Sequence, residues 1–182
     1  MTRETIDYGI DLGTTRSAIA LLQGTEVEVF RNDEGFETTP SAVWLDKGGN
    51  LVVGRAARER LEMDPENAFS GFSAQMGTSA VYTFARTGRR MRSEELAAEV
   101  LKALKKAAER KTGEEVEAAV ITVPAAFELP HCKATDDAAK LAGFRVSPLL
   151  QEPVAAAMAY GLQSESDRVH WLVYDLGGGT FD

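Results

Sequence analysis

The sequence contains little of what defines several common classes of protein. It has one cysteine, Cys132, so no disulfide can form within the chain, and a reducing compartment is expected. Its longest apolar runs cover about ten residues, roughly half of the length that a helix needs to cross a membrane. The first nine residues, MTRETIDYG, lack the apolar core of a secretory signal. We therefore expect a cytoplasmic protein without a membrane partner.

Basic residues are also scarce. The chain has 20 lysines and arginines against 28 aspartates and glutamates, a formal net charge of −8, which predicts no nucleic-acid partner. One basic cluster, Arg86, Arg89, Arg90 and Arg92, is interpreted as a solvated loop. Walker A and G-x-G-x-x-G patterns are absent as well, and this excludes a P-loop and a Rossmann dinucleotide site.

Apolar periodicity predicts a mixed α/β fold. Strands are expected at residues 8–13, 17–24, 26–33, 38–45, 51–54, 116–124, 144–150 and 169–178. Helices are expected at residues 55–62, from Ser93 to Gly113, at 130–142 and from Pro153 onward, and 67–92 reads as irregular. Strands that alternate with helices in the second half indicate a mixed sheet with helices on both faces.

Two similar loops stand near the two ends of the sequence. The first, DLGTT, has Asp11 at the end of a buried strand, followed by Gly13, Thr14 and Thr15. The second, DLGGGTFD, repeats the design with other members: Asp175, Gly177, Gly178, Gly179 and Thr180. Successive N–H groups and hydroxyls can cradle phosphate oxygens, and an aspartate can hold a hydrated Mg²⁺. One such loop alone could be a simple glycine-rich turn, but the pair predicts a grip on one polyphosphate from two sides.

A further carboxylate, Glu152, immediately precedes the helix that starts at Pro153. It can act on water or on a metal in the same cleft, or it can simply be an acidic residue at a helix start. The small residues that follow it allow the helix to pack closely against its neighbours.

The strings that carry these features resemble the seventy-kilodalton heat-shock chaperones, the DnaK-like proteins. They occur in this order along nearly the whole chain: GIDLGTTRS, NDEGFETTPS, AVITVPAAF, ATDDAAKLAGF, QEPVAAAMAYG and YDLGGGTFD. Actin and sugar kinases share the two phosphate loops but not these strings.

The resemblance implies an actin-like ATPase fold made of two ribonuclease-H-like lobes, of which this chain is similar to the first. Such a lobe implies a mixed five-stranded sheet flanked by helices. The expected divisions are a core at 1–37, a small inserted α+β subdomain at 38–92, more core at 93–168, and the first strand and phosphate loop of the second lobe at 169–182. It also implies ATP or ADP as ligand, with Mg²⁺ between Asp11 and Asp175. Glu152 and Asp182 would lie beside the metal, the attacking water and monovalent cations such as K⁺. The implied catalytic set is thus Asp11, Glu152, Asp175 and Asp182.

By the same resemblance, ATP hydrolysis would switch a separate C-terminal peptide-binding domain that holds client proteins. A J-domain co-chaperone and a nucleotide-exchange factor would assist it. We expect that domain to lie outside residues 1–182, and we expect these residues alone to bind ATP weakly and to be inactive as an ATPase. The strand Val169–Asp175 is expected to be frayed, or paired with a second copy of the chain.

The sequence departs from the family pattern at three places. The family's catalytic lysine falls on Ser73, and Arg16, after the first loop, could replace its charge. In the family, a proline equivalent to Pro124 works with an arginine in interdomain coupling. The position of that arginine falls on Cys132 in this sequence. The excursion between Gly77 and Ser93 is short, which predicts a reduced subdomain.

Two hypotheses follow, together with a remote third. The first is the ATP-binding lobe of a divergent DnaK-like chaperone. The second is a nucleotide-sensing interaction module of the same fold with little hydrolysis. The third, a small-molecule kinase, would need a base for a sugar hydroxyl, and no sugar-site motif is present.

Overall fold

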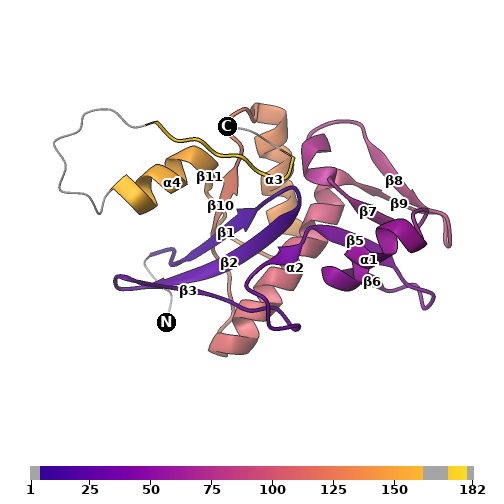
Figure 1. The fold of residues 1–182 in the computed structure, drawn as a ribbon, viewed down its shortest axis with the longest axis horizontal. Helices are drawn as coiled ribbons and strands as arrows, with labels where there is room; N and C mark the ends of the chain where they lie inside the picture. Colours follow the sequence, from indigo (N-terminus) through magenta and orange to yellow (C-terminus); the bar gives the residue numbers. More distant parts are fainter. Residues whose placement is uncertain (1–4, 162–171, 180–182) are drawn as a thin grey trace.

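A computed structural model describes residues 5–161 and 172–179, and its centre is a mixed β-sheet. The strands of its main path are β1 (Tyr8–Leu12), β2 (Arg16–Gln23), β3 (Glu26–Val29), β10 (Val120–Val123) and β11 (Leu149–Gln151). They are ordered β11-β10-β1-β2-β3 (Figure 1), and a short strand, β4 (Thr39–Pro40), also pairs with β2. Strands β1, β10 and β11 are parallel, whereas β2 is antiparallel to both β1 and β3. This confirms the predicted five-stranded mixed sheet.

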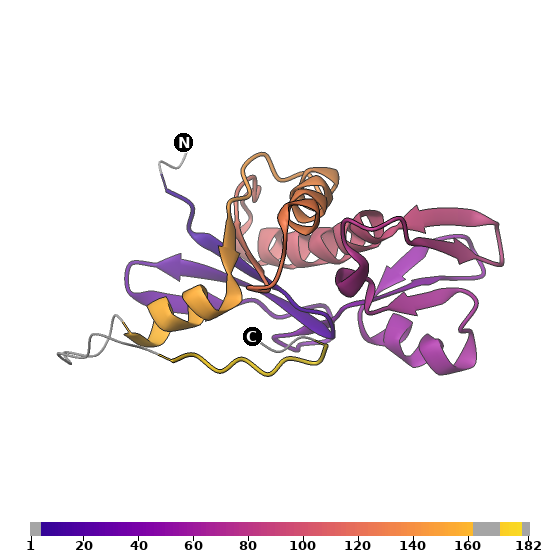
Figure 2. The same ribbon diagram turned by 90° about the horizontal axis from the view of Figure 1, so that it is seen from above.

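Helices cover both faces of this sheet. Helices α2 (Ser93–Thr112) and α3 (Leu129–Leu141) lie on one face, and α4 (Glu152–Gly161) lies on the other (Figure 2). The alternation of side chains along β1 explains the division, since Tyr8, Ile10 and Leu12 are buried while Asp11 remains exposed. The hydrophobic core is therefore on the α2 and α3 side, and the face that carries Asp11 is open to form a site.

Helix α2 provides much of that core. Its predicted apolar face is confirmed, because five residues at helical spacing are all buried: Leu96, Val100, Leu101, Leu104 and Ala108. Gly113 ends the helix in the left-handed conformation, with φ of 71°. The predicted cap was wrong by one residue, because Ser93 is the first helical residue. The carboxylate of Glu95 instead accepts a 2.7 Å hydrogen bond from the backbone N–H of Arg92.

The segment between β3 and α2 forms a smaller α/β unit beside the main sheet (Figure 1). Its three-stranded sheet has the order β6 (Leu51–Val53), β5 (Ala42–Leu45) and β7 (Ala68–Ser70), with α1 (Arg55–Met63) packed against it. A short 3₁₀ helix, η1 (Phe72–Gln75), follows β7 and leads toward α2. The sequence predicted β5, β6 and α1, and it did not predict β7 or η1.

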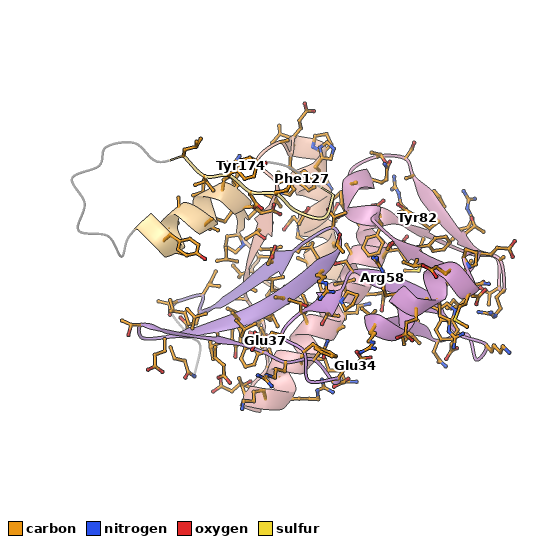
Figure 3. The ribbon with its side chains drawn as sticks, in the orientation of Figure 1. Glu34, Glu37, Arg58, Tyr82, Phe127 and Tyr174 are labelled. Carbon is orange, nitrogen blue, oxygen red and sulfur yellow. The ribbon has the colours of Figure 1, made fainter. Side chains whose placement is uncertain are left out.

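The expectation of irregular structure at 67–92 is wrong. After β7 and η1 comes a β-hairpin of β8 (Val81–Phe84) and β9 (Arg89–Arg92). The hairpin is held by aromatic packing: Tyr82 lies against Phe69 with ring centroids 5.2 Å apart (Figure 3), and Phe84 lies 4.9 Å from the same ring. The arginine cluster is therefore on a strand and its preceding turn, not on a loop.

Asp64 ties this hairpin to the three-stranded sheet. Its carboxylate accepts hydrogen bonds from Trp44 Nε1 at 2.9 Å, from Asn67 Nδ2 at 2.7 Å and from Arg86 Nη2 at 2.7 Å. These hydrogen bonds, together with the charge of Arg86, hold the pKa of Asp64 well below its ordinary value. Asp64 thus links β5, the loop that precedes β7 and the turn between β8 and β9 through hydrogen bonds.

Two segments near the C-terminal end were predicted as strands, the second with the expectation that it is frayed. The strand predicted at 144–150 is reduced to an isolated bridge at Val146 and to β11, which begins at Leu149. Of the strand predicted at 169–178, residues 169–171 lie outside the described part, and 172–175 form no strand. Leu172 and Tyr174 are 95% and 70% exposed. Among the described residues, 172–175 therefore pair with no strand, in agreement with the expected fraying, and Leu176 forms a single bridge.

Within the described ranges, we find no helix with the length and apolar character that a membrane crossing requires.

Candidate functional site

The first predicted loop is the tight turn from β1 to β2. A Cβ added at Gly13 would overlap the backbone carbonyl oxygen of Arg16, so the turn itself requires glycine at this position. Ser41 fixes the turn from outside: its hydroxyl donates a 2.7 Å hydrogen bond to the Gly13 carbonyl. Its backbone N–H donates to the Thr15 carbonyl at 2.9 Å. The loop that carries Thr14 and Thr15 is therefore held in a defined shape.

The second predicted loop lies directly against the first. Figures 1 and 2 both show the segment 172–179 running from the side of α4 back to the turn between β1 and β2. A Cβ added at Gly178 would overlap Oγ1 of Thr15, and one added at Gly179 would stand 2.6 Å from Cγ2 of Thr14. The two loops, 164 positions apart at their aspartates, thus meet through glycine on one side and threonine on the other.

A cleft of about 610 Å³ opens between the two loops and α4. Its acidic lining residues are Asp11, Glu152 and Asp175. The loop residues along it are Gly13, Thr14, Thr15, Arg16, Gly177 and Gly178, and the rest of the wall is Thr122, Ala155, Ala156 and Ala159. The structure therefore brings together most of the residues that the sequence singled out. Thr180 and Asp182 lie outside the described residues, and Gly179 contacts Thr14 beside the cleft.

Asp11 is in a perturbed electrostatic environment. Its side chain has access to solvent, yet the surrounding protein removes part of the hydration of the carboxylate. This desolvation raises the pKa of Asp11, the charge of Asp175 raises it further, and a 3.1 Å hydrogen bond from Thr122 Oγ1 lowers it. Asp175 is consequently close enough for its charge to act on Asp11.

Glu152 is half-buried at the first residue of α4, at the wall of the same cleft. The three alanines of α4 that line the cleft have short side chains, which leave its interior open beside the carboxylates. Across residues 5–161 and 172–179, no three acidic, histidine or cysteine side chains are grouped closely enough to hold a metal by themselves. The donor set suits a cation that keeps its own water ligands and takes only one or two carboxylates, as Mg²⁺ does.

Ser73 reaches this site from the smaller unit. It is the second residue of η1, it is 9% exposed, and its hydroxyl donates a 3.0 Å hydrogen bond to Oγ1 of Thr14. Gly77, four residues later, packs against Pro130, since a Cβ there would stand 2.5 Å from its carbonyl oxygen. Ser73 therefore lies next to the first loop and places a neutral hydroxyl there.

Two contributors to the site were missed by sequence reasoning. Thr122 is hydrogen-bonded to Asp11, which lies 111 residues away in the sequence. Ser41 is hydrogen-bonded to Gly13, which lies 28 residues away. Only the parallel pairing of β1 with β10, which matches Ile10 with Ile121, brings Thr122 beside Asp11. A threonine in a buried strand carries no local signal of that role.

Cys132, half-buried, lies on α3 with its thiol 3.9 Å from the Phe127 carbonyl oxygen.

Comparison with known proteins gives a clear result. The sequence model of the family "Hsp70 protein" matches residues 7–85 and 78–182, and these two segments together cover nearly the entire chain. The chain belongs to the Hsp70 family. The two matched segments of this Hsp70 chain overlap at 78–85, inside the stretch that the sequence predicted to be shortened.

Curated relatives agree with this assignment. The chain is 45% identical over 174 residues to the chaperone protein DnaK of two strains of Halobacterium salinarum. The alignment covers 96% of this chain and 27% of each relative, so the chain spans about a quarter of their length. As a member of the Hsp70 family it has the mixed sheet, flanking helices and small antiparallel sheets of an actin-like lobe, which confirms the predicted fold class.

Proposed function

We propose that this chain is the ATP-binding N-terminal lobe of a divergent DnaK-like chaperone. The observation that carries the proposal is the contact between the two glycine-containing loops, with Gly178 against Thr15, beside a cleft lined by three carboxylates. Backbone N–H groups and threonine hydroxyls on both sides of such a cleft suit a polyphosphate. In this account Gly13, Thr14 and Thr15 hold phosphate oxygens from one side, and Gly177 to Thr180 hold them from the other.

Mg²⁺ fits the chemistry of the cleft and would be held by Asp11 and Asp175. Two carboxylates that sense each other's charge are stabilised when a divalent cation lies between them. The cation would neutralise charge on the phosphates when bound. Thr122 orients the Asp11 carboxylate through its hydrogen bond, and Glu152, at the opposite wall, is suited to orient a water molecule.

In the natural polypeptide that contains residues 1–182, ATP binding and hydrolysis would be coupled to protein folding. The partners we propose are client proteins, a J-domain co-chaperone and a nucleotide-exchange factor, by membership of the Hsp70 family and similarity to DnaK. ADP and K⁺ are the further ligands that the account includes.

A second candidate function is favoured by Ser73. A neutral hydroxyl hydrogen-bonded to Thr14 cannot give the charge stabilisation that a lysine would give to a developing phosphate charge. This favours a nucleotide-sensing module that binds ATP and hydrolyses it slowly.

A single-turnover ATP hydrolysis measurement on the natural polypeptide separates the two functions. DnaK of Halobacterium salinarum, measured in parallel, provides the reference rate. A comparable rate supports the chaperone ATPase and contradicts the sensor. A rate lower by roughly a hundredfold, the loss that one missing charge contact typically causes, supports the sensor. Failure to bind Mg·ATP at all would contradict both.

A further inference from the structure

The described lining of the cleft contains a single cationic side chain, that of Arg16. The other charged residues along the described wall are the carboxylates Asp11, Glu152 and Asp175. A polyphosphate that enters this acidic cleft meets strong repulsion unless cations offset it. A divalent metal supplies part of that positive charge, and Arg16 is the residue of the described wall that can supply more.

The position of Arg16 suits a direct contact with the ligand. It is the first residue of β2 and directly follows Thr15, so its backbone is part of the first loop. Pairing with Pro40 of β4 fixes that backbone in place. The residue is exposed and lines the cleft, so its guanidinium N–H donors can reach a ligand there.

The present contact of the Arg16 side chain is weak. Its one hydrogen bond to the described residues runs from Nη1 to Oγ1 of Thr38 at 3.4 Å, near the limit for a hydrogen bond. Such a bond is easily exchanged for a stronger one. A guanidinium forms paired, charge-assisted hydrogen bonds with phosphate oxygens, which are shorter and stronger than a bond to a hydroxyl.

We propose that Arg16 is a ligand-binding residue whose guanidinium leaves Thr38 and contacts the polyphosphate of the bound nucleotide. The inference rests on the proposed function and adds to it the residue that compensates for the neutral Ser73 in binding. Arg16 holds the ligand in this account, and it does not restore the contact that a lysine at position 73 would make. In this account Arg16 contributes to binding, and position 73 affects hydrolysis.

The test is calorimetric titration of the natural polypeptide with Mg·ATP, Mg·ADP and adenosine. Arg16→Ala is expected to weaken Mg·ATP and Mg·ADP roughly ten- to hundredfold, the effect of losing a hydrogen bond to a charged group. Adenosine binding should not change, because adenosine carries no phosphate. Arg16→Lys should recover part of the affinity, since it restores the charge without the paired geometry.

Two control variants address the alternative that Arg16 only positions the segment around Thr38. Thr38→Val removes the hydroxyl partner and should leave nucleotide affinity unchanged. Arg90→Ala removes one positive charge from the exposed surface of β9 and should also have no effect.

The outcomes are distinguishable from failure of the proposed function. If the wild type binds no Mg·ATP, the proposed function itself is contradicted. If the wild type binds but Arg16→Ala binds equally well, or if Thr38→Val weakens binding as much as Arg16→Ala does, only the Arg16 assignment is overturned.

Discussion

The hydroxyl of Ser73 donates a 3.0 Å hydrogen bond to the hydroxyl of Thr14, and Thr14 in turn packs against Gly179. This relationship links three parts of the chain that are far apart in sequence: η1 of the smaller unit, the first loop and the second loop. It also places a neutral hydroxyl directly beside the first loop. The shape of the phosphate site and the rate of hydrolysis can therefore be changed separately.

Restoring a charge at position 73 should raise the rate of hydrolysis. We expect Ser73→Lys to increase the single-turnover rate of the natural polypeptide by roughly a hundredfold, because one well-placed electrostatic contact contributes about 3 kcal/mol to a transition state. The matched control is Ser73→Met, which adds similar bulk without charge and should not raise the rate. An unchanged rate in Ser73→Lys with intact folding would contradict the assignment of this position.

The contact between the loops should depend on the absence of a side chain at position 178. Gly178→Ala forces a methyl group into Oγ1 of Thr15 and separates the loops, so Mg·ATP affinity should fall by at least about tenfold. Gly9→Ala is the matched control, because nothing lies within 4 Å of an added Cβ there. Calorimetry on both variants checks the expectation. Equal affinities would show that the loops need not touch.

The sign of the pH effect on stability can be derived for Asp11. Its pKa in the folded protein is above the ordinary value of 3.8, so the folded state binds a proton more tightly than the unfolded state. The stability of the metal-free protein therefore falls as pH rises from 3.8 through the raised pKa. Asp11→Asn removes this penalty and should raise the melting temperature at pH 7 while weakening Mg²⁺-dependent nucleotide binding.

The opposite pH dependence of stability is expected for an aspartate whose charged form is stabilised by its surroundings. Hydrogen bonds from Asn50 lower the pKa of Asp46, so Asp46→Asn should lower the melting temperature at pH 7 and leave nucleotide binding intact. Thermal unfolding of both variants at pH 7 and near pH 3 gives the comparison. The difference from wild type should shrink for both at the acidic pH. A lower melting temperature for Asp11→Asn at pH 7 would contradict the account.

The Asp64 network should stabilise the smaller unit without contributing to the cleft. Asp64→Asn removes the negative charge that pairs with Arg86 and that accepts hydrogen bonds from Trp44 and Asn67. The melting temperature should therefore fall. The folded-state pKa is lowered, so this stability is present above pH 3.8 and is lost as the pH falls below it. Glu62→Gln, at an exposed position of α1, is the control and should leave the curve unchanged. Equal melting temperatures for the two variants at pH 7 would contradict the role of Asp64.

Sequence reasoning recovered the features that are encoded locally. The buried face of α2, the paired strands β1 and β2, and both loops have clear periodic or glycine signals, and all are present where they are described. The β8–β9 hairpin was missed because β9 has three exposed arginines and only Met91 inside, so its pattern resembles a charged loop. Its stability comes from Phe69, which is distant in sequence from the hairpin turn.

The site was predictable in its residues but not in its connections. Asp11 and the glycines could be selected because their residue types suit phosphate and metal. The hydrogen bonds from Thr122, Ser41 and Ser73 depend on strand register and on the placement of the smaller unit. No short stretch of sequence contains that information. The absence of a strand at 172–175 was expected, because a strand requires a neighbour with which to pair.

Hydrogen–deuterium exchange of the natural polypeptide, with and without Mg·ATP, tests the central claim most directly. The claim is that one ligand is held from both sides by the two loops. The predicted result is that Mg·ATP slows exchange in both loop peptides, around residues 11–16 and 175–180, at the same ligand concentration. Protection of one loop alone, or of neither while Mg·ATP is bound, would contradict the account.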